Sequence, residues 1–149
     1  MGQSGGRADR EVSALPPKLA EVVDMLAMFT DRNEKIQAII SIAESFRGTQ
    51  NPKPYDESHR VPGCESEVYA WAESEDGRWH FEFAVENPQG LSAMAFGTIL
   101  QNGLDGLTKD EIFEVPDELV YDIFGRELSM GKSMGLINML QMCKRLSSA

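Results

Sequence analysis

The sequence has little positive charge and no long apolar segment. Its 149 residues include 14 Lys and Arg against 24 Asp and Glu, so the formal net charge is −10. Nucleic-acid phosphates are bound through clustered basic side chains, and anionic membrane surfaces attract the same side chains. No apolar run approaches the roughly 20 residues that cross a bilayer. We therefore expect no nucleic acid and no membrane among its partners, which leaves proteins and small molecules.

Cysteine and histidine are also scarce. Cys64 and Cys143 lie far apart without a C-x-x-C pair, and His59 and His80 are the only histidines. This set is neither a disulfide framework nor a thioredoxin-type redox pair, and it does not make a convincing tetrahedral metal site. The glycine-rich motifs that bind nucleotide phosphates are missing. We expect free thiols in a reducing, cytoplasmic compartment, no metal site and no cofactor of its own.

Length and composition fit one compact domain. A chain of 149 residues with 42% apolar side chains is long enough for a hydrophobic core and short for two domains. Residues 1–10 are polar and Gly-rich, without the apolar stretch of a secretory signal. We expect a disordered tail over residues 1–15 and a single domain over residues 16–149.

Hydrophobic periodicity predicts helices at both ends of this domain and a β-hairpin between them. Apolar residues alternate on either side of Glu75-Asp76-Gly77, which predicts a hairpin turn there. Thr108 and Glu111 have the offset of a capping box. Helical spacing occurs over residues 19–29, 31–46, 91–102, 117–124 and 132–146, and Gly48 is the stop signal expected for the second of these helices. The predicted fold class is α+β: a small antiparallel sheet, with a hairpin core, packed on one side by N-terminal and C-terminal helices.

The two cysteines have different surroundings. Cys143 lies on the apolar stripe of the last predicted helix, where a cysteine usually fills the core. We expect most of the methionines at helical spacing, which are Met94, Met130, Met134, Met139 and Met142, to lie in the core as well. Cys64 instead follows Pro62-Gly63, and a glycine can take the positive φ that lets the chain turn sharply before the thiol. Loops held by a rigid scaffold often carry function.

Two interpretations of Cys64 stay open at this point. The residue is either a semi-buried cysteine that fills a gap or a reactive thiol. Nearby charges do not decide, because His59 and Arg60 favour a thiolate whereas Glu65 and Glu67 disfavour one. His59, five positions before the thiol, could also approach it as a base, although nothing in the spacing requires this.

The residues around Cys64 match a known motif. The segment V61-P62-G63-C64-E65-S66-E67-V68-Y69 resembles the G-C-x-S-x-V-[W/Y] motif of the SufE family, whose members are partners of cysteine desulfurases in iron–sulfur cluster assembly. The resemblance extends in order over about residues 18–146. It includes T30-D31-R32-N33-E34-K35, Q89-G90-L91, G106-L107-T108-K109-D110-E111-I112 and S129-M130-G131-K132-S133-M134-G135-L136.

This sequence departs from the family pattern in two places. Lys132 stands where the family's closing motif usually has Arg, so the charge is kept but the planar fork of donors is lost. The segment F83-A84-V85-E86-N87 replaces a Gly-Asp-Ser-Asp-like run, so no acidic role is carried over to that segment.

The resemblance implies a SufE/IscU-like fold and a sulfur-transfer accessory protein rather than a stand-alone enzyme. Cys64 would accept a persulfide sulfur from a SufS-like cysteine desulfurase, stimulate that enzyme, and deliver the sulfur to a downstream iron–sulfur scaffold. Pyridoxal phosphate would belong to the partner, and the protein itself would carry only the covalent persulfide. The residues expected to shape the loop or contact the partner are Gly63, Glu65, Ser66, Glu67 and Lys132.

Three other functions compete with this one. A non-catalytic adaptor would bind a desulfurase while Cys64 stays inert. An IscU-type scaffold would need about three converging metal ligands, which this chain does not offer. A thiol peroxidase or redox sensor would form a sulfenic acid at Cys64, and no motif supports it.

Overall fold

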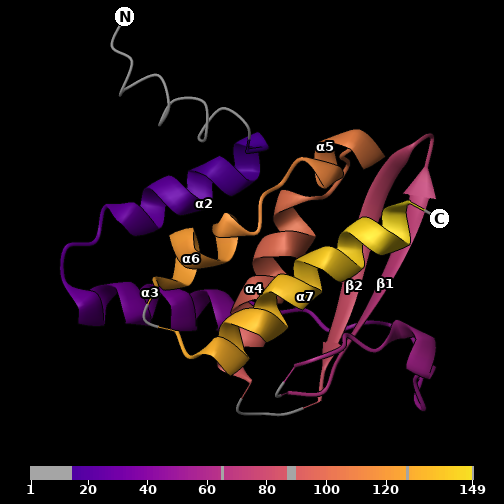
Figure 1. Ribbon diagram of the computed structural model, residues 1–149, viewed down its shortest axis with the longest axis horizontal. Coiled ribbons are helices and arrows are strands. Elements are labelled where there is room, and N and C mark those ends of the chain that lie inside the picture. The colour runs from indigo at the N-terminus through magenta and orange to yellow at the C-terminus, as the bar shows by residue number, and fades with distance from the viewer. Residues whose placement is uncertain (1–14, 65, 87–89, 127, 149) are drawn as a thin grey trace, which may run out of the picture.

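The computed structural model describes residues 15–64, 66–86, 90–126 and 128–148. Over these residues the chain forms six α-helices, one short 3₁₀ helix and one antiparallel hairpin (Figure 1). In chain order the elements are α2 (Pro17–Ala27), α3 (Arg32–Glu44), η1 (Glu57–His59), β1 (Val68–Glu75), β2 (Arg78–Val85), α4 (Leu91–Gly103), α5 (Lys109–Phe113), α6 (Glu118–Phe124) and α7 (Met130–Ser147). None of the helices in these ranges is long and apolar enough to cross a membrane.

The hairpin has the turn that the sequence predicts. Its register runs from Val68 opposite Val85 to Glu75 opposite Arg78, which leaves a two-residue loop. Asp76 and Gly77 both have positive φ, at 55° and 77°. Positive φ at both central residues defines a type I′ turn, whose twist suits two-residue hairpins.

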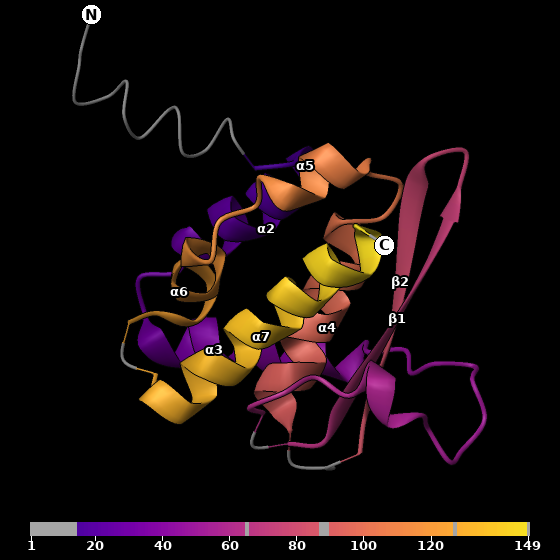
Figure 2. The ribbon, with the colours of Figure 1, turned by 45° about the vertical axis from the view of Figure 1, so that its right-hand side comes forward.

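Helices cover one face of the hairpin (Figure 2). Val68, Ala70, Phe81 and Phe83 share that face and are all buried, since α7 packs against β1 and α4 packs against β2. Helices α2, α3 and α6 then surround α4 and α7 on the side away from the sheet. The predicted α+β architecture with helices on one side is therefore confirmed.

The segment before β1, which includes η1, covers part of the opposite face of the hairpin. The Tyr55 ring lies 4.9 Å from the Tyr69 ring and 5.2 Å from the Trp71 ring, measured between centroids. The His59 ring stacks on Trp71 at 5.2 Å. These contacts add to the packing of the helices on the other face, which a two-stranded sheet needs for its stability.

The second helix ends earlier than predicted. α3 begins after Asp31, whose carboxylate accepts a hydrogen bond from the Asn33 backbone N–H, but it ends at Glu44 rather than at Gly48. The Ser45 hydroxyl donates to the carbonyl of Ile42, a local bond that competes with helix continuation. Gly48 then forms an isolated parallel bridge with Phe83, so the glycine lies against the sheet instead of ending the helix.

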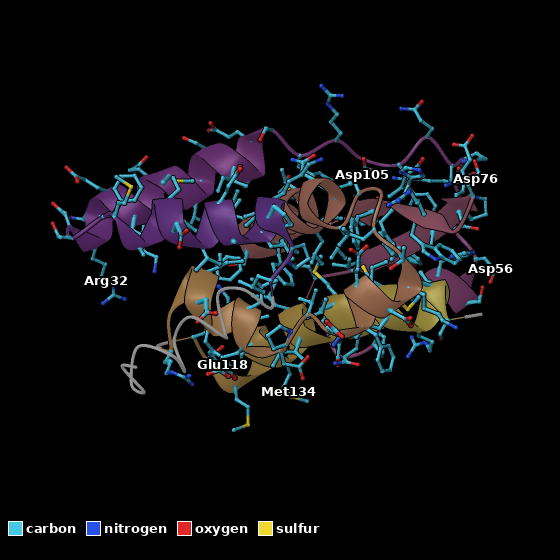
Figure 3. All side chains as sticks on the ribbon, turned by 90° about the horizontal axis from the view of Figure 1, so that it is seen from above. Arg32, Asp56, Asp76, Asp105, Glu118 and Met134 are labelled. Atoms are coloured by element: carbon cyan, nitrogen blue, oxygen red, sulfur yellow. The ribbon has the colours of Figure 1, made fainter. Side chains whose placement is uncertain are left out.

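The methionines at the start of the last helix are exceptions to the expected burial. Met139 and Met142 are buried as predicted, but Met130 and Met134 are 81% and 51% exposed. Figure 3 places Met134 at the outer edge of the molecule. The first turns of α7 extend beyond the hydrophobic core, so helical spacing alone does not decide what these side chains contact.

Candidate functional site

The segment between Val61 and Val68 carries the thiol and is called the Cys64 loop. The sheet closes this loop at its base. Arg60 and Tyr69 form an isolated antiparallel bridge, and the Val61 N–H donates to the Val68 carbonyl at 2.8 Å. Gly63 has a φ of +72°, the left-handed conformation expected for the residue before the cysteine. The chain therefore passes beside the start of β1 before it enters that strand, and the thiol is carried between these two points.

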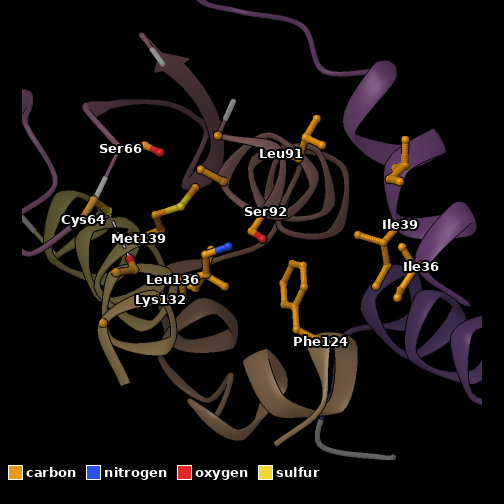
Figure 4. A pocket seen from close by; sticks show the side chains of 15 residues that line it. Ile36, Ile39, Cys64, Ser66, Leu91, Ser92, Phe124, Lys132, Leu136 and Met139 are labelled. Carbon is orange, nitrogen blue, oxygen red and sulfur yellow. Dashed lines mark hydrogen bonds between the residues drawn. The ribbon is translucent and has the colours of Figure 1, made fainter. Parts of the chain in front are cut away.

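Helix α7 holds the tip of this loop. The Asn138 carboxamide donates to the Pro62 carbonyl at 2.8 Å, and the Cys64 thiol donates to the Gly135 carbonyl at 3.3 Å (Figure 4). A Cβ atom at Gly135 would lie 3.1 Å from Cys64 Cα and 3.3 Å from Sγ. The loop can approach the helix this closely because position 135 has no side chain.

The Cys64 thiol is protonated at neutral pH in this arrangement. The side chain is half-buried, and burial raises the pKa of the thiol to about 11, although the Arg60 guanidinium lowers it to a smaller extent. The donated hydrogen bond to Gly135 requires the protonated form as well. The sulfur becomes an effective nucleophile only when it leaves this position or when another positive charge approaches it.

A cavity of about 470 Å³ lies beside the sulfur. Its walls are mainly apolar and come from the Cys64 loop and helices α3, α4, α6 and α7. Lys132 lines it as well, and Figure 4 shows its ammonium group directed into the cavity toward Ser92. The lining side chains that Figure 4 labels are Ile36, Ile39, Cys64, Ser66, Leu91, Ser92, Phe124, Lys132, Leu136 and Met139.

The structure brings some of the predicted site residues together and separates others. Ser66 and Lys132 line the same cavity as Cys64, with Gly63 directly before the thiol. Glu67 lies 3.8 Å from Arg60 and accepts a hydrogen bond from the Tyr69 hydroxyl at 2.8 Å, which is the largest cause of the raised pKa, about 12, of that phenol. Glu65 lies outside the described residues.

The histidines have other contacts. The His59 Nδ1 atom is 2.9 Å from the Ala70 carbonyl, and its ring stacks on Trp71. The His80 Nδ1 atom is 2.6 Å from an Asp105 carboxylate oxygen. Neither arrangement is a base presented to Cys64.

Two residues of the site were missed by the sequence interpretation. Gly135 and Asn138 both contact the loop. Gly135 lies in the segment 129–136 that carries part of the family resemblance, but it was not assigned to the site, and Asn138 looks like an ordinary helix residue. The usable signal was spacing, because Lys132, Gly135 and Asn138 are three positions apart and so lie on one side of a helix. A family motif already pointed to Lys132, and this spacing would have extended the site along α7.

The second cysteine lies in the core, away from solvent. Cys143 is fully buried, as predicted, and burial raises the pKa of its thiol far above the usual range. Within residues 15–64, 66–86, 90–126 and 128–148, no group of three or more His, Cys, Asp or Glu side chains is arranged to hold a metal ion.

Comparison with known proteins gives consistent results. A family model described as "SufE: Fe-S metabolism associated domain" matches residues 20–147. The chain is 26% identical over 134 residues to an uncharacterized SufE-like protein from Synechocystis sp., covering 87% of this chain and 80% of that protein. The solution structure of a hypothetical protein from Thermus thermophilus matches with a TM-score of 0.73 at 22% identity, covering 90% of this chain and 96% of that one. This last similarity concerns the fold alone.

Proposed function

Because the chain belongs to the SufE family of Fe–S metabolism associated domains, we propose that Cys64 accepts sulfur from a cysteine desulfurase. In this proposal the protein is an accessory to Fe–S metabolism that carries sulfur covalently, stimulates the desulfurase and passes the sulfur to a cluster scaffold. The observation that carries the proposal is the placement of one thiol on a loop with a fixed base, beside a cavity. The reducing cytoplasm would keep that thiol free.

The transfer is an exchange between two sulfur–sulfur bonds. The Cys64 thiolate attacks the terminal sulfur of a persulfide on the desulfurase cysteine. A new bond forms between Cys64 Sγ and that sulfur, the old sulfur–sulfur bond breaks, and the desulfurase cysteine leaves as a thiolate. The terminal sulfur keeps its oxidation level and its proton, so no external oxidant or reductant is needed.

The closed position of the thiol makes this reaction dependent on the partner. Cys64 Sγ is protonated and bonded to Gly135, so the loop must open before an in-line approach to another protein's persulfide is possible. Opening at the tip can leave the Val61–Val68 bond at the base intact. Docking of the desulfurase would stabilise the open loop and supply the positive field that favours a thiolate.

The surface around the cavity fits a protein partner. Leu91 and Ile36, which line the cavity, are 44% and 42% exposed, and Met130 on the first turn of α7 is 81% exposed. Exposed apolar side chains of this size gain stability when another protein covers them. Flexible methionines also adapt well to a partner's surface.

A direct test is intact mass spectrometry after mixing the protein with a cysteine desulfurase and free cysteine, without added reductant. We expect a gain of one or more sulfur atoms that is reversed by a small thiol. The Cys64→Ser variant should gain nothing, because the attacking sulfur is missing. Cys143→Ala is the matched control and should gain sulfur as the unmodified protein does, because Cys143 is fully buried.

Other outcomes would point elsewhere. If no sulfur is gained and the Cys64→Ser variant stimulates desulfurase turnover as well as the unmodified protein, the chain is an adaptor with an inert thiol. If the Cys64→Ser variant gains sulfur, or if the Cys143→Ala variant gains none, Cys64 is not the sulfur acceptor.

A further inference from the structure

The tip and the base of the Cys64 loop are held by bonds of different kinds. At the base, backbone groups pair with each other: Val61 N–H with the Val68 carbonyl at 2.8 Å, and Glu86 N–H with the Glu67 carbonyl at 2.9 Å. At the tip, the described hydrogen bonds to α7 are one from Asn138 to the Pro62 carbonyl and one from the Cys64 thiol to the Gly135 carbonyl. A thiol is a weak donor, so the Asn138 bond is the stronger of these two.

The Asn138 carboxamide also covers the residue before the cysteine. A Cβ atom at Gly63 would lie 2.7 Å from Asn138 Nδ2, so the carboxamide packs directly over the glycine. Asn138 therefore contacts Pro62 through a hydrogen bond and Gly63 through packing, the two residues that lead into Cys64. The left-handed φ of +72° at Gly63 is held between these contacts.

We infer that Asn138 is a latch: a positioning residue that keeps the Cys64 loop closed and so sets how often the thiol is exposed. The inference rests on the proposed function, because a sulfur acceptor whose loop opens too often would lose its sulfur to small thiols in solution. Opening breaks the Asn138 and Cys64 bonds at the tip and leaves the base paired. The fraction of open loops then depends directly on the strength of the Asn138 bond.

Helix α7 provides a matched control for this bond. Gln141, three residues after Asn138, also donates a side-chain amide hydrogen bond, in this case to the Asp117 carboxylate at 2.7 Å. Removing either amide deletes one hydrogen bond from the same helix. Only the Asn138 bond leads to the Cys64 loop, so only its loss should expose the thiol.

The test measures the rate at which iodoacetamide alkylates Cys64 in the free protein. Loss of one such hydrogen bond shifts an equilibrium by about 5-fold, so Asn138→Ala and Asn138→Leu should each react about 5-fold faster than the unmodified protein at the same pH. Leucine has the branched shape of asparagine, with two methyl groups in place of the amide oxygen and nitrogen, and it suits a helix, so it separates loss of the bond from loss of the packing. Gln141→Ala should react at the unmodified rate.

The pH dependence of alkylation gives a second readout. Because the closed thiol must open before it ionises, a 5-fold larger open fraction lowers the pH midpoint of the reaction by about 0.7 units in the Asn138 variants. All charged side chains, including Arg60 and Lys132 near the thiol, are the same in every variant. A general loss of stability would instead make Cys143 reactive.

Three results would overturn the latch: an unchanged rate in both Asn138 variants, an equal increase in Gln141→Ala, or simultaneous alkylation of Cys143. No desulfurase is present, so the outcome is independent of the mass test for sulfur transfer. Faster alkylation without any persulfide would support the latch and contradict the proposed function. Normal persulfide formation with an unchanged alkylation rate would do the reverse.

Discussion

At the scale of single residues, the cavity beside the Cys64 thiol also holds a cation from a distant part of the chain. Cys64 and Lys132 line one cavity, although the hairpin, α4, α5 and α6 lie between them in the sequence. The lysine ammonium is a compact charge on a flexible stem, so it can follow a sulfur that moves. A positive charge near a thiol favours its ionised form.

We expect the Lys132→Ala variant to take up sulfur from a desulfurase roughly 3-fold to 10-fold more slowly, because the thiolate of the open loop loses a nearby cation. Lys132→Arg should keep most of the rate, since it keeps the charge. The rate is measured by intact mass in quenched time points. Lys109→Ala, which removes an exposed lysine on α5 outside the cavity lining, serves as the control. Equal rates for Lys132→Ala and the unmodified protein would remove Lys132 from the site.

The sequence predicted part of this residue-level arrangement. Gly63 takes the positive φ that its position before Cys64 suggested, and Lys132 was placed in the site by the resemblance to a family motif. The protonation of Cys64 could not be predicted, because charges near it in the chain disagreed and burial is the largest cause of its raised pKa. Burial depends on α7, which approaches the thiol only in the folded protein.

At the scale of elements, α2 and α4 are packed through a glycine. Leu19 of α2 is fully buried. A Cβ atom at Gly103 of α4 would lie 2.7 Å from the Cγ atom of Leu19 and closer still to the Cδ2 atom of Leu19. Non-bonded carbon atoms do not lie this close together, so one of the two side chains would have to move. The two helices can meet here because α4 ends in a residue without a side chain.

Gly103→Ala should therefore lower the free energy of unfolding by about 1–3 kcal/mol, the usual effect of overpacking a tight core. The better helix propensity of alanine offsets only part of this loss. Urea unfolding followed by circular dichroism measures the change. Asn102→Ala, at the neighbouring exposed position, should be neutral or slightly stabilising. A Gly103→Ala variant as stable as the unmodified protein would mean that Leu19 moves aside without cost.

Elements were predicted well where the signal is local. The alternation on both sides of Asp76-Gly77 gave the hairpin, and the Thr108–Glu111 capping box is present as expected. The contact of Asn138 with Pro62 had no such signal, since the two residues are 76 positions apart. Exposure of Met130 was missed for the same reason: helical spacing shows which residues share a face but not what that face meets.

At the scale of the whole molecule, the closed thiol links stability to pH. Cys64 keeps its proton up to a pKa of about 11, whereas an ordinary thiol loses it near 9.0. Between these values the folded protein binds more protons than the unfolded chain, so stability is full below about pH 9 and falls as pH rises toward 11. The pKa values of the buried Cys143 and Tyr69 are raised as well. The effect of Cys64 must therefore be measured as the difference in stability between the unmodified protein and a variant without this thiol.

We expect the stability advantage of the unmodified protein over Cys64→Ser to shrink by on the order of 1 kcal/mol between about pH 8 and about pH 10.5. This free-energy change is smaller than the full pKa shift would give, because water still reaches the half-buried thiol. Urea unfolding of both proteins at the two pH values measures it. A difference that stays constant or grows would show that Cys64 is not held protonated in the folded protein.

The hairpin tip has a consequence for how copies of this protein meet at high concentration. Trp79 at the start of β2 is bridged to Leu107, so among the described residues the edge left at the tip is that of β1, and a bare strand edge can pair with the edge of another molecule and begin aggregation. Glu73, Glu75 and Asp76 are exposed along this stretch. Two such tips would bring like charges together across the new pair, so the acidic side chains protect the hairpin from edge-to-edge association.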